Sequence, residues 1–158
     1  MSSITPCLWF NGQAEEAVNF YVSLFKDSSI DFIMPNGKGM RFPEGSALMV
    51  EFTIKGQRMQ ALNGGPEFNF TEAISLSVEC EDQAEIDHLW DSLCADGGQP
   101  MQCSWLKDKY GVAWQIVPKF WRDVMRSKDL EAQQRAMQAL MTMNKLIIAD
   151  LELAYKGE

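Results

Sequence analysis

The stretch DKYGVAWQIVP, Asp108–Pro118, combines a turn, a strand and a stop signal. Its YG pair marks the turn, because glycine accepts backbone conformations that other residues avoid. In the run that follows, side chains alternate between the two faces of a strand, so Trp114 and Ile116 share one face and Gln115 lies on the other. The stretch therefore predicts a strand that presents a neutral amide opposite two large apolar side chains.

Upstream of this stretch, strand and helix patterns alternate. Residues 73–80, AISLSVEC, alternate between apolar and polar as a strand does. Residues 81–98, EDQAEIDHLWDSLCADGG, have helical spacing of their apolar positions and end on a glycine pair, which is a typical helix stop. Residues 101–108, MQCSWLKD, supply a further strand. The second half of the chain is therefore expected to form a strand, a helix and then strands.

The first half has the same order of elements. Residues 3–10 suit a first strand, residues 14–25 a helix, and residues 46–54 and 58–62 the two strands of a hairpin around KGQ. The segment Ile30–Gly45 contains two prolines and several glycines and is interpreted as a long flexible loop.

The two halves form an internal repeat of about seventy residues. The triplet QAE occurs at Gln13 and again at Gln83. The apolar positions of the two helices also correspond: Ala17, Phe20, Tyr21, Leu24 and Phe25 match Ile86, Leu89, Trp90, Leu93 and Cys94. Each unit therefore contains a strand, a helix and further strands.

The tail, residues 129–155, contains neither proline nor glycine, and its apolar residues recur with a helical period. We expect one helix, packed on the domain or on a partner subunit. The predicted organisation is a domain over residues 1–128, with modules at about 3–66 and 72–118, followed by a C-terminal extension over 129–158.

Composition excludes several classes of protein. The chain has 158 residues, 46% of them apolar, and a formal net charge of -8. Its basic residues are scattered, which argues against a nucleic-acid partner. No apolar run is long enough to span a membrane, and the start MSSITPCLWF does not resemble a signal peptide. We therefore expect a cytoplasmic protein with no membrane partner.

The chain resembles the vicinal oxygen chelate superfamily of glyoxalases, bleomycin-resistance proteins and extradiol dioxygenases, and within it the PhnB-like branch. The residues that carry the resemblance are ITPCLWFNGQAEEAVNFY (4–21), LNGGPEF (62–68), AISLSVEC (73–80), CSWLKDKYGVAWQIVP (103–118) and AMQALMTMNKLIIADLELA (136–154). The resemblance implies an α+β fold of two tandem βαβββ modules, whose curved mixed sheets enclose a cleft, and a homodimer.

Some members of this branch are described as 3-demethylubiquinone 3-methyltransferases. A methyl donor such as S-adenosylmethionine usually binds at a glycine-rich turn between a strand and a helix. The candidate turns here, NGKG and NGGP, do not open a helix. We therefore expect that the methyltransferase description does not give the activity of this chain, and we predict no cofactor.

The resemblance also implies where metal ligands would lie: near Pro6, at Glu51 or Gln60, near Ala73 or Ile74, and at Gln115. Proline and alanine cannot bind a metal ion, and glutamine is a poor substitute for glutamate because it brings no charge. One carboxylate does not hold a catalytic divalent ion, so no metal site is predicted. The sequence contains one histidine, His88, which is expected on an exposed part of the second helix.

Five residues are candidates for binding a small-molecule ligand in the cleft: Glu51, Gln115, Trp105, Trp9 and Asn63. Each also has a structural alternative. The two tryptophans can pack between sheet and helix, the asparagine can serve its own turn, and the glutamate can lie on a solvated face.

Three functions are therefore left open. The first is a metal-free small-molecule binding protein, for which the acidic balance and Glu51 suit a cationic or polar aromatic ligand. The second is an enzyme of the lyase, isomerase or dioxygenase type with atypical metal or base residues; its catalytic residues are unknown, and Glu51 is the best-placed base. The third is a dimeric interaction domain that uses the tail as its contact.

Overall fold

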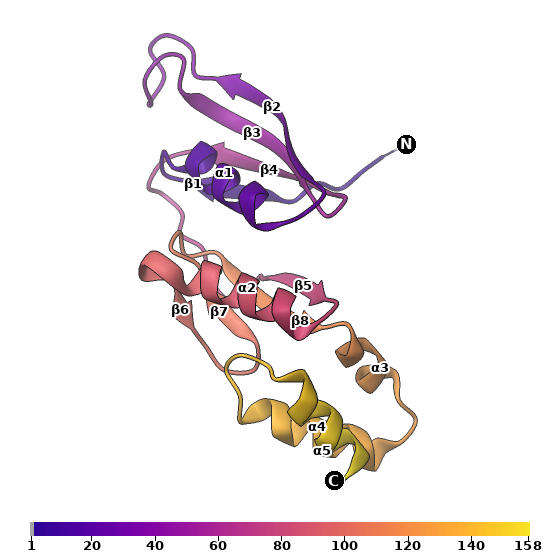
Figure 1. Cartoon of the computed structure of the whole chain (residues 1–158). Coiled ribbons are helices and arrows are strands. Elements are labelled where there is room, and N and C mark those ends of the chain that lie inside the picture. The colour runs from indigo at the N-terminus through magenta and orange to yellow at the C-terminus, as the bar shows by residue number, and fades with distance from the viewer. Residues whose placement is uncertain (1) are drawn as a thin grey trace. The chain divides into compact units, whose positions relative to one another are not determined.

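The computed structural model describes residues 2–158 and divides into two compact units, the first ending at Phe70 and the second running from Thr71 to Glu158 (Figure 1). Each unit contains one four-stranded mixed sheet with a helix packed on one face. The predicted α+β fold of tandem βαβββ modules is confirmed.

The first unit consists of β1 (Cys7–Phe10), α1 (Ala14–Leu24), β2 (Ser28–Pro35), β3 (Ala47–Ile54) and β4 (Gln57–Asn63). Its strand order is β1-β4-β3-β2, with β1 parallel to β4 and the other pairs antiparallel. The predicted hairpin between β3 and β4 is confirmed, and its turn residues Lys55 and Gly56 both have positive φ, as a two-residue hairpin turn requires.

The core of the first unit lies between α1 and one face of the sheet. Val18 and Tyr21 on the helix, and Val50 and Phe52 on β3, are fully buried. Glu51, between the last two, is only half-buried because the pleat directs it to the opposite face. The alternation predicted for this strand is therefore confirmed, and burial of its apolar face fixes the register of the sheet.

The prediction of a loop from Ile30 is wrong for its first part, because Ser28–Pro35 forms β2, paired antiparallel to β3. Its side chains are mostly exposed, including Phe32 and Met34. The strand therefore lacks the buried, alternating pattern by which strands are recognised, and it forms because β3 offers a free edge for pairing.

The second unit repeats the arrangement with β5 (Leu76–Cys80), α2 (Gln83–Cys94), β6 (Gln99–Pro100), β7 (Trp105–Lys107) and β8 (Ala113–Pro118). The strand order β5-β8-β7-β6 matches that of the first unit, and β5 is again parallel to its neighbour. The predicted helix buries Ile86, Leu89, Trp90 and Leu93, whereas His88 is exposed.

The DKYG turn is organised by Asp108, which is 2% exposed. One carboxylate oxygen accepts hydrogen bonds from the backbone N–H groups of Tyr110 (2.9 Å) and Val112 (3.0 Å). The other accepts one from the indole of Trp114 at 2.9 Å. A buried carboxylate needs such donors to offset the loss of hydration, so this motif has a structural role in holding β7 and β8 together.

The tail forms two helices, α4 (Leu130–Met141) and α5 (Ile148–Lys156), and a further helix, α3 (Phe120–Arg126), precedes it, so the prediction of one helix over 129–155 is wrong. The helix breaks because the carbonyl groups of Met143 and Asn144 accept hydrogen bonds from the backbone N–H groups of Cys103 (2.8 Å) and Ser104 (3.0 Å) instead of from a further helical turn. Tertiary pairing here outweighs the helical period of the sequence.

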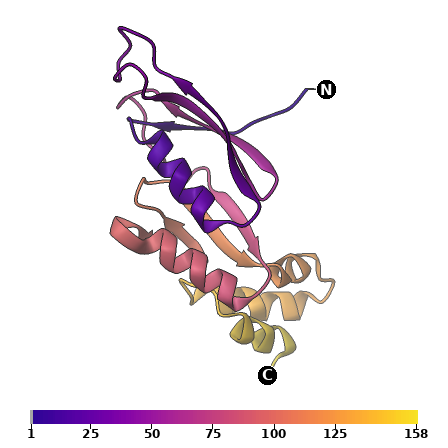
Figure 2. The same cartoon turned by 45° about the horizontal axis from the view of Figure 1, so that its top comes forward.

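The helices α4 and α5 lie side by side, as Figures 1 and 2 both show. Arg135 on α4 donates to the last carbonyl groups of α5, to Ala154 O at 3.1 Å and to Tyr155 O at 2.8 Å. Leu140, Leu146 and Leu151 form a buried cluster between them. No helix among residues 2–158 is long and apolar enough to cross a membrane.

Candidate functional site

A cavity of about 430 Å³ lies within the second unit. Its floor is the face of the sheet opposite α2, and its walls come from α3 and α4. The residues that line it are Ser77, Glu79, Cys103, Ser104, Trp105, Gln115, Val117, Pro118, Trp121, Arg122, Met125, Arg126, Met137 and Leu140. The tail is therefore part of the cavity, and does not merely extend from the domain.

Gln115 lies at the centre of the floor. In the sheet register it is paired with Ser77 on one side and with Trp105 on the other, so the three side chains form a row across β5, β8 and β7. Its amide nitrogen donates to the hydroxyl of Ser75 at 2.8 Å. Its amide oxygen accepts no hydrogen bond from the part of the chain that the structure describes, and so can accept one from a ligand.

The walls are mainly apolar. Trp121 and Met125 come from α3, and Met137 and Leu140 come from α4. Val117 continues this apolar surface along the floor and packs against the leucine cluster of the tail. Apolar residues are thus the majority of the lining, as in most small-molecule sites, and the polar and charged ones share the rest.

The charged groups lie on one side of the cavity. Arg122 forms an ion pair with Glu79. Arg126, one helical turn further along α3, is exposed and has no ion pair among residues 2–158. The lining therefore contains two guanidinium groups and one carboxylate.

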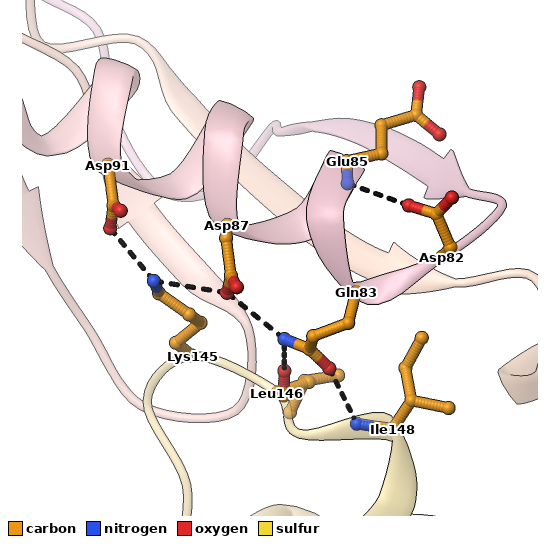
Figure 3. Close-up of polar contacts among 8 residues, drawn as sticks. All are labelled: Asp82, Gln83, Glu85, Asp87, Asp91, Lys145, Leu146 and Ile148. Atoms are coloured by element: carbon orange, nitrogen blue, oxygen red, sulfur yellow. Dashed lines mark hydrogen bonds and ion pairs between the residues drawn. The ribbon is translucent and has the colours of Figure 1, made fainter.

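Two contacts hold the tail against α2, and Figure 3 shows both. Gln83, at the start of α2, donates to the carbonyl of Leu146 at 3.1 Å and accepts from the N–H of Ile148 at 2.9 Å. Lys145 lies 2.8 Å from Asp91 and 3.2 Å from Asp87. One glutamine thus satisfies two backbone groups at the start of α5, where the helix has no N-cap side chain of its own.

The contact of Lys145 with Asp87 and Asp91 shifts the pKa of the lysine and of Asp87. Burial alone lowers the pKa of Lys145, but its hydrogen bonds to Asp91 and Asp87 outweigh burial and raise that pKa above its ordinary value. The pKa of Asp87 is lowered, first by the hydrogen bond from Gln83 and then by that from Lys145. Both shifts favour the charged pair at neutral pH.

The backbone at Cys103 and Ser104 has positive φ in both residues, at 59° and 74°. This left-handed conformation costs energy for residues other than glycine. It is held by the two hydrogen bonds that the backbone N–H groups of these residues donate to carbonyl groups of the tail, and both residues lie in the cavity lining.

The five predicted site residues fall in different units. Gln115 and Trp105 line the cavity of the second unit, whereas Glu51, Trp9 and Asn63 belong to the first. Glu51 accepts a hydrogen bond from Gln60 at 3.1 Å and lies 3.9 Å from Arg58. The carboxylate is thus partly neutralised within its own sheet.

Trp9 and Asn63 have structural contacts in the first unit. The indole N–H of Trp9 donates to Gly65 O at 2.9 Å, and its ring packs edge-on against Phe68 and so close to Gly64 that a Cβ there would lie 2.3 Å away. Asn63 is 5% exposed; its amide donates to Ala47 O and accepts from the N–H of Ala14, each at 2.9 Å. That second bond satisfies a free N–H at the start of α1.

The structure also identifies the counterpart of Gln115 in the first unit. Gln60 on β4 is paired with Cys7 on one side and with Glu51 on the other, just as Gln115 is paired with Ser77 and Trp105. The corresponding position in each unit is therefore a glutamine.

Sequence reasoning missed the residues of α3 that line the cavity: Trp121, Arg122, Met125 and Arg126. A signal was present, because KFWRDVMR repeats an aromatic or apolar residue followed by arginine four positions apart, which places both pairs on one face of a helix. The short length of this segment concealed it.

The positions that the resemblance implies for metal ligands do not fit a divalent ion. Gln60 and Gln115 bring neutral oxygens, and the carboxylate of Glu51 already accepts a hydrogen bond and faces an arginine. Residues 2–158 contain no group of three or more His, Cys, Asp or Glu side chains placed to hold a metal ion.

A methyl donor fits no better. Both sheets are mixed, and the turns at Gly37–Gly39 and Gly64-Gly65 lead into loops and strands, never into a helix. The usual cradle for such a donor, a glycine-rich turn between a parallel strand and a helix N-terminus, is not formed at these glycines.

The tandem mixed sheets, each with its helix on one face, define the class of protein by its fold, the glyoxalase-like fold. Within it, the chain belongs to the PhnB-like family whose model is described as 3-demethylubiquinone-9 3-methyltransferase, which matches residues 2–117. No curated protein matches the chain.

Solved structures agree with this assignment. A PhnB protein of Bacillus cereus, provisionally described as a 3-demethylubiquinone-9 3-methyltransferase, is 38% identical with a TM-score of 0.68; the match covers 74% of this chain and 99% of that one. A protein of Pseudomonas aeruginosa is 20% identical over 75% of this chain and 98% of its own, with a TM-score of 0.61.

The fold also occurs in the fosfomycin resistance protein FosX of Listeria monocytogenes, solved with Mn(II) and sulfate, at 11% identity and a TM-score of 0.52, covering 80% of this chain and 98% of that one. The family match ends at residue 117, so the helices that wall the cavity lie beyond it.

Proposed function

We propose that the chain is a metal-free small-molecule binding protein whose ligand occupies the cavity of the second unit. The observation that carries this proposal is the row of Ser77, Gln115 and Trp105 on the cavity floor, facing apolar walls from α3 and α4. The volume, about 430 Å³, lies within the range of ordinary ligand sites. Trp105 supplies a flat apolar surface, and the amide oxygen of Gln115 supplies one polar anchor.

The proposal that no metal takes part rests on the glutamines at the two corresponding positions. Elemental analysis by mass spectrometry of untagged protein, purified without chelators, tests it. We expect far less than one equivalent of zinc, nickel, manganese or iron per chain. Close to one equivalent would contradict the metal-free part of the proposal.

The alternative of an enzyme needs a general base, and the arrangement of acids does not favour one. Glu51 is paired with Gln60 and Arg58, and Glu79 in the cavity is paired with Arg122. The methyltransferase activity named for the family is not part of the proposal, because no glycine-rich cradle supports it. Binding without turnover needs only the shape and the polar anchor of the cavity.

The homodimer and the cytoplasmic location stay predictions. Truncation after Ser127, followed by measurement of mass in solution, tests whether the tail mediates a dimer. A monodisperse dimer of the truncated chain would remove the tail from that role.

The binding proposal can be tested with N-phenyl-1-naphthylamine, an uncharged aromatic probe that fluoresces when it leaves water. Ser77→Trp fills the cavity from its edge strand, whereas Cys7→Trp makes the same change at the corresponding register position of the first unit. We expect the probe to bind the wild type and the Cys7→Trp variant, and to lose at least about tenfold in affinity in Ser77→Trp, or about 1.4 kcal/mol. Equal affinity for both variants would contradict the site.

A further inference from the structure

The charges of the cavity differ in sign from the charge of the whole chain. The protein carries a net charge of -8, yet the cavity lining contains Arg122 and Arg126 against the single acid Glu79. At physiological salt, exposed charges farther away than about 8 Å are largely screened. The charge that a bound ligand meets is therefore set by the groups beside it.

The two arginines have different roles. Arg122 is already neutralised by its ion pair with Glu79. Arg126 is exposed at the cavity edge and has no ion pair within residues 2–158. A guanidinium group presents paired N–H donors that match the two oxygens of a carboxylate or sulfonate. One such group on a ligand would make the lining neutral.

The rest of the lining suits a flat apolar body. Trp105 and Trp121 are both partly exposed in the cavity, and Met125 and Met137 supply flexible side chains that adapt to an aromatic ring. The floor offers the amide oxygen of Gln115 and the hydroxyl of Ser77 for a polar substituent. The lining therefore combines an aromatic surface with one unpaired cation at its edge.

We infer that the ligand of this cavity is an aromatic molecule carrying one oxyanion, such as a carboxylate or sulfonate, with the anion at Arg126. The inference rests on the proposed function, since it specifies the ligand of the same site. It reverses the expectation of a cationic ligand, which followed from the net charge of the whole chain and from Glu51. That glutamate lies in the first unit and does not line this cavity.

Two matched probes test the inference. 8-Anilinonaphthalene-1-sulfonate and N-phenyl-1-naphthylamine share the same aromatic body, and only the first carries an anion. Fluorescence titrations give the ratio of their dissociation constants for the wild type, for Arg126→Gln, and for Lys128→Gln. The lysine is an exposed cation just beyond α3 that does not line the cavity, so its variant makes the same charge change outside the site.

We expect the wild type to prefer the anionic probe, and Arg126→Gln to weaken its binding about threefold to fivefold, as loss of an exposed ion pair does. Affinity for the neutral probe should not change in Arg126→Gln, and Lys128→Gln should affect neither probe. The preference should decrease at high salt.

Other results overturn the inference in distinguishable ways. Equal binding of both probes in the wild type, with both lost in Ser77→Trp, would keep the proposed function and reject the anionic ligand. Equal losses of anionic-probe affinity in Arg126→Gln and Lys128→Gln would show a diffuse charge effect and reject the role of Arg126. Binding of neither probe to the wild type would reject the proposed function itself.

Discussion

The two units have the same strand order and the same glutamine at the centre of the sheet, yet only the second has helices on both faces of its sheet. In the first unit α1 covers one face, and the opposite face carries Glu51, Gln60 and Arg58 in contact with one another. In the second unit the corresponding face carries Gln115 and Trp105 and is walled by α3 and α4. On this face, the second unit therefore has a cavity of about 430 Å³ walled by helices.

In both units the strands place the central glutamine in the same way. The difference between the two sheet faces comes from the residues after Pro118, which form the helices beside the second sheet. A row of polar side chains on an open sheet forms contacts along the sheet itself. The same row beneath two helices becomes the floor of a pocket, because the added apolar walls exclude water from its polar groups. The family match does not reach these walls, so the proposed site includes a segment outside it.

The largest expected effect comes from undocking the tail. Leu151 is fully buried in the leucine cluster of α4 and α5, whereas Leu153 on the same helix is 44% exposed. Leu151→Ala should lower the free energy of unfolding by about 2–5 kcal/mol, because it leaves a cavity in the cluster. Urea unfolding followed by circular dichroism measures it. Leu153→Ala is the control, with an expected change within about 0.5 kcal/mol; similar losses in both variants would contradict the packing of the tail.

Gln83 and Gln13 occupy corresponding positions of the repeat but have different contacts. Gln83 bonds the backbone of Leu146 and Ile148, whereas Gln13, its counterpart in the first unit, is exposed and makes no side-chain cap to α1. Gln83→Ala should cost about 1–3 kcal/mol, since it leaves backbone groups unpaired. Gln13→Ala should be close to neutral, and the same unfolding experiment compares them. Equal effects would mean that the tail does not depend on this contact.

Gln115 and Gln60, at corresponding positions of the two sheets, test which unit holds the ligand. Gln115→Leu should change binding of naphthalene little, because that ligand has no hydrogen-bond donor. It should weaken binding of 1-naphthol, whose hydroxyl can donate to the amide oxygen of Gln115, by about threefold to tenfold. Gln60→Leu makes the same change in the first unit and should leave both affinities unchanged. Fluorescence titration or calorimetry provides the constants. A larger effect at Gln60 would move the site to the first unit.

The smallest expected effect is a change with pH in the contribution of Asp87 to the free energy of unfolding. The pKa of Asp87 is held below its ordinary value of 3.8, first by Gln83 and then by Lys145. A lowered pKa contributes stability that is present above pH 3.8 and is lost as the pH falls through the lower value in the folded protein. The difference in unfolding free energy between the wild type and Asp87→Asn should therefore shrink on acidification below that pH. A difference independent of pH would contradict the coupling.

Much of the fold could be predicted from local pattern. The helices α1 and α2, the hairpin and the alternation of β3 and β8 follow from burial on one face, which the sequence pattern indicates directly. The strand β2 was missed because the prolines and glycines of Ile30–Gly45 indicated a loop, and because its side chains, Phe32 and Met34 among them, are exposed and not part of a core. The break between α4 and α5 could not be found either, because it depends on hydrogen bonds from Cys103 and Ser104, distant in sequence.

The site was predictable only in part. Of the predicted site residues, Gln115 and Trp105 line the cavity that we propose as the site. A strand period shows which residues share a face, and it placed Gln115 opposite Trp114 and Ile116. The alternation along β3 also made Glu51 a candidate, but alternation does not indicate which of the two sheets the C-terminal helices cover. Arg126 and Trp121 were missed because the pattern in KFWRDVMR is short, and because it shows a shared helix face but not that α3 lies beside the sheet.

The most direct test of the account is to locate a bound probe. Proton–nitrogen correlation spectra of the labelled protein, titrated with 8-anilinonaphthalene-1-sulfonate, report which residues sense it. The account predicts that shifts concentrate on Ser77, the indole of Trp105, the side-chain amide of Gln115 and the region of Arg126. Shifts that concentrate instead on Glu51, Gln60 and the indole of Trp9 would contradict it and place the ligand on the first unit.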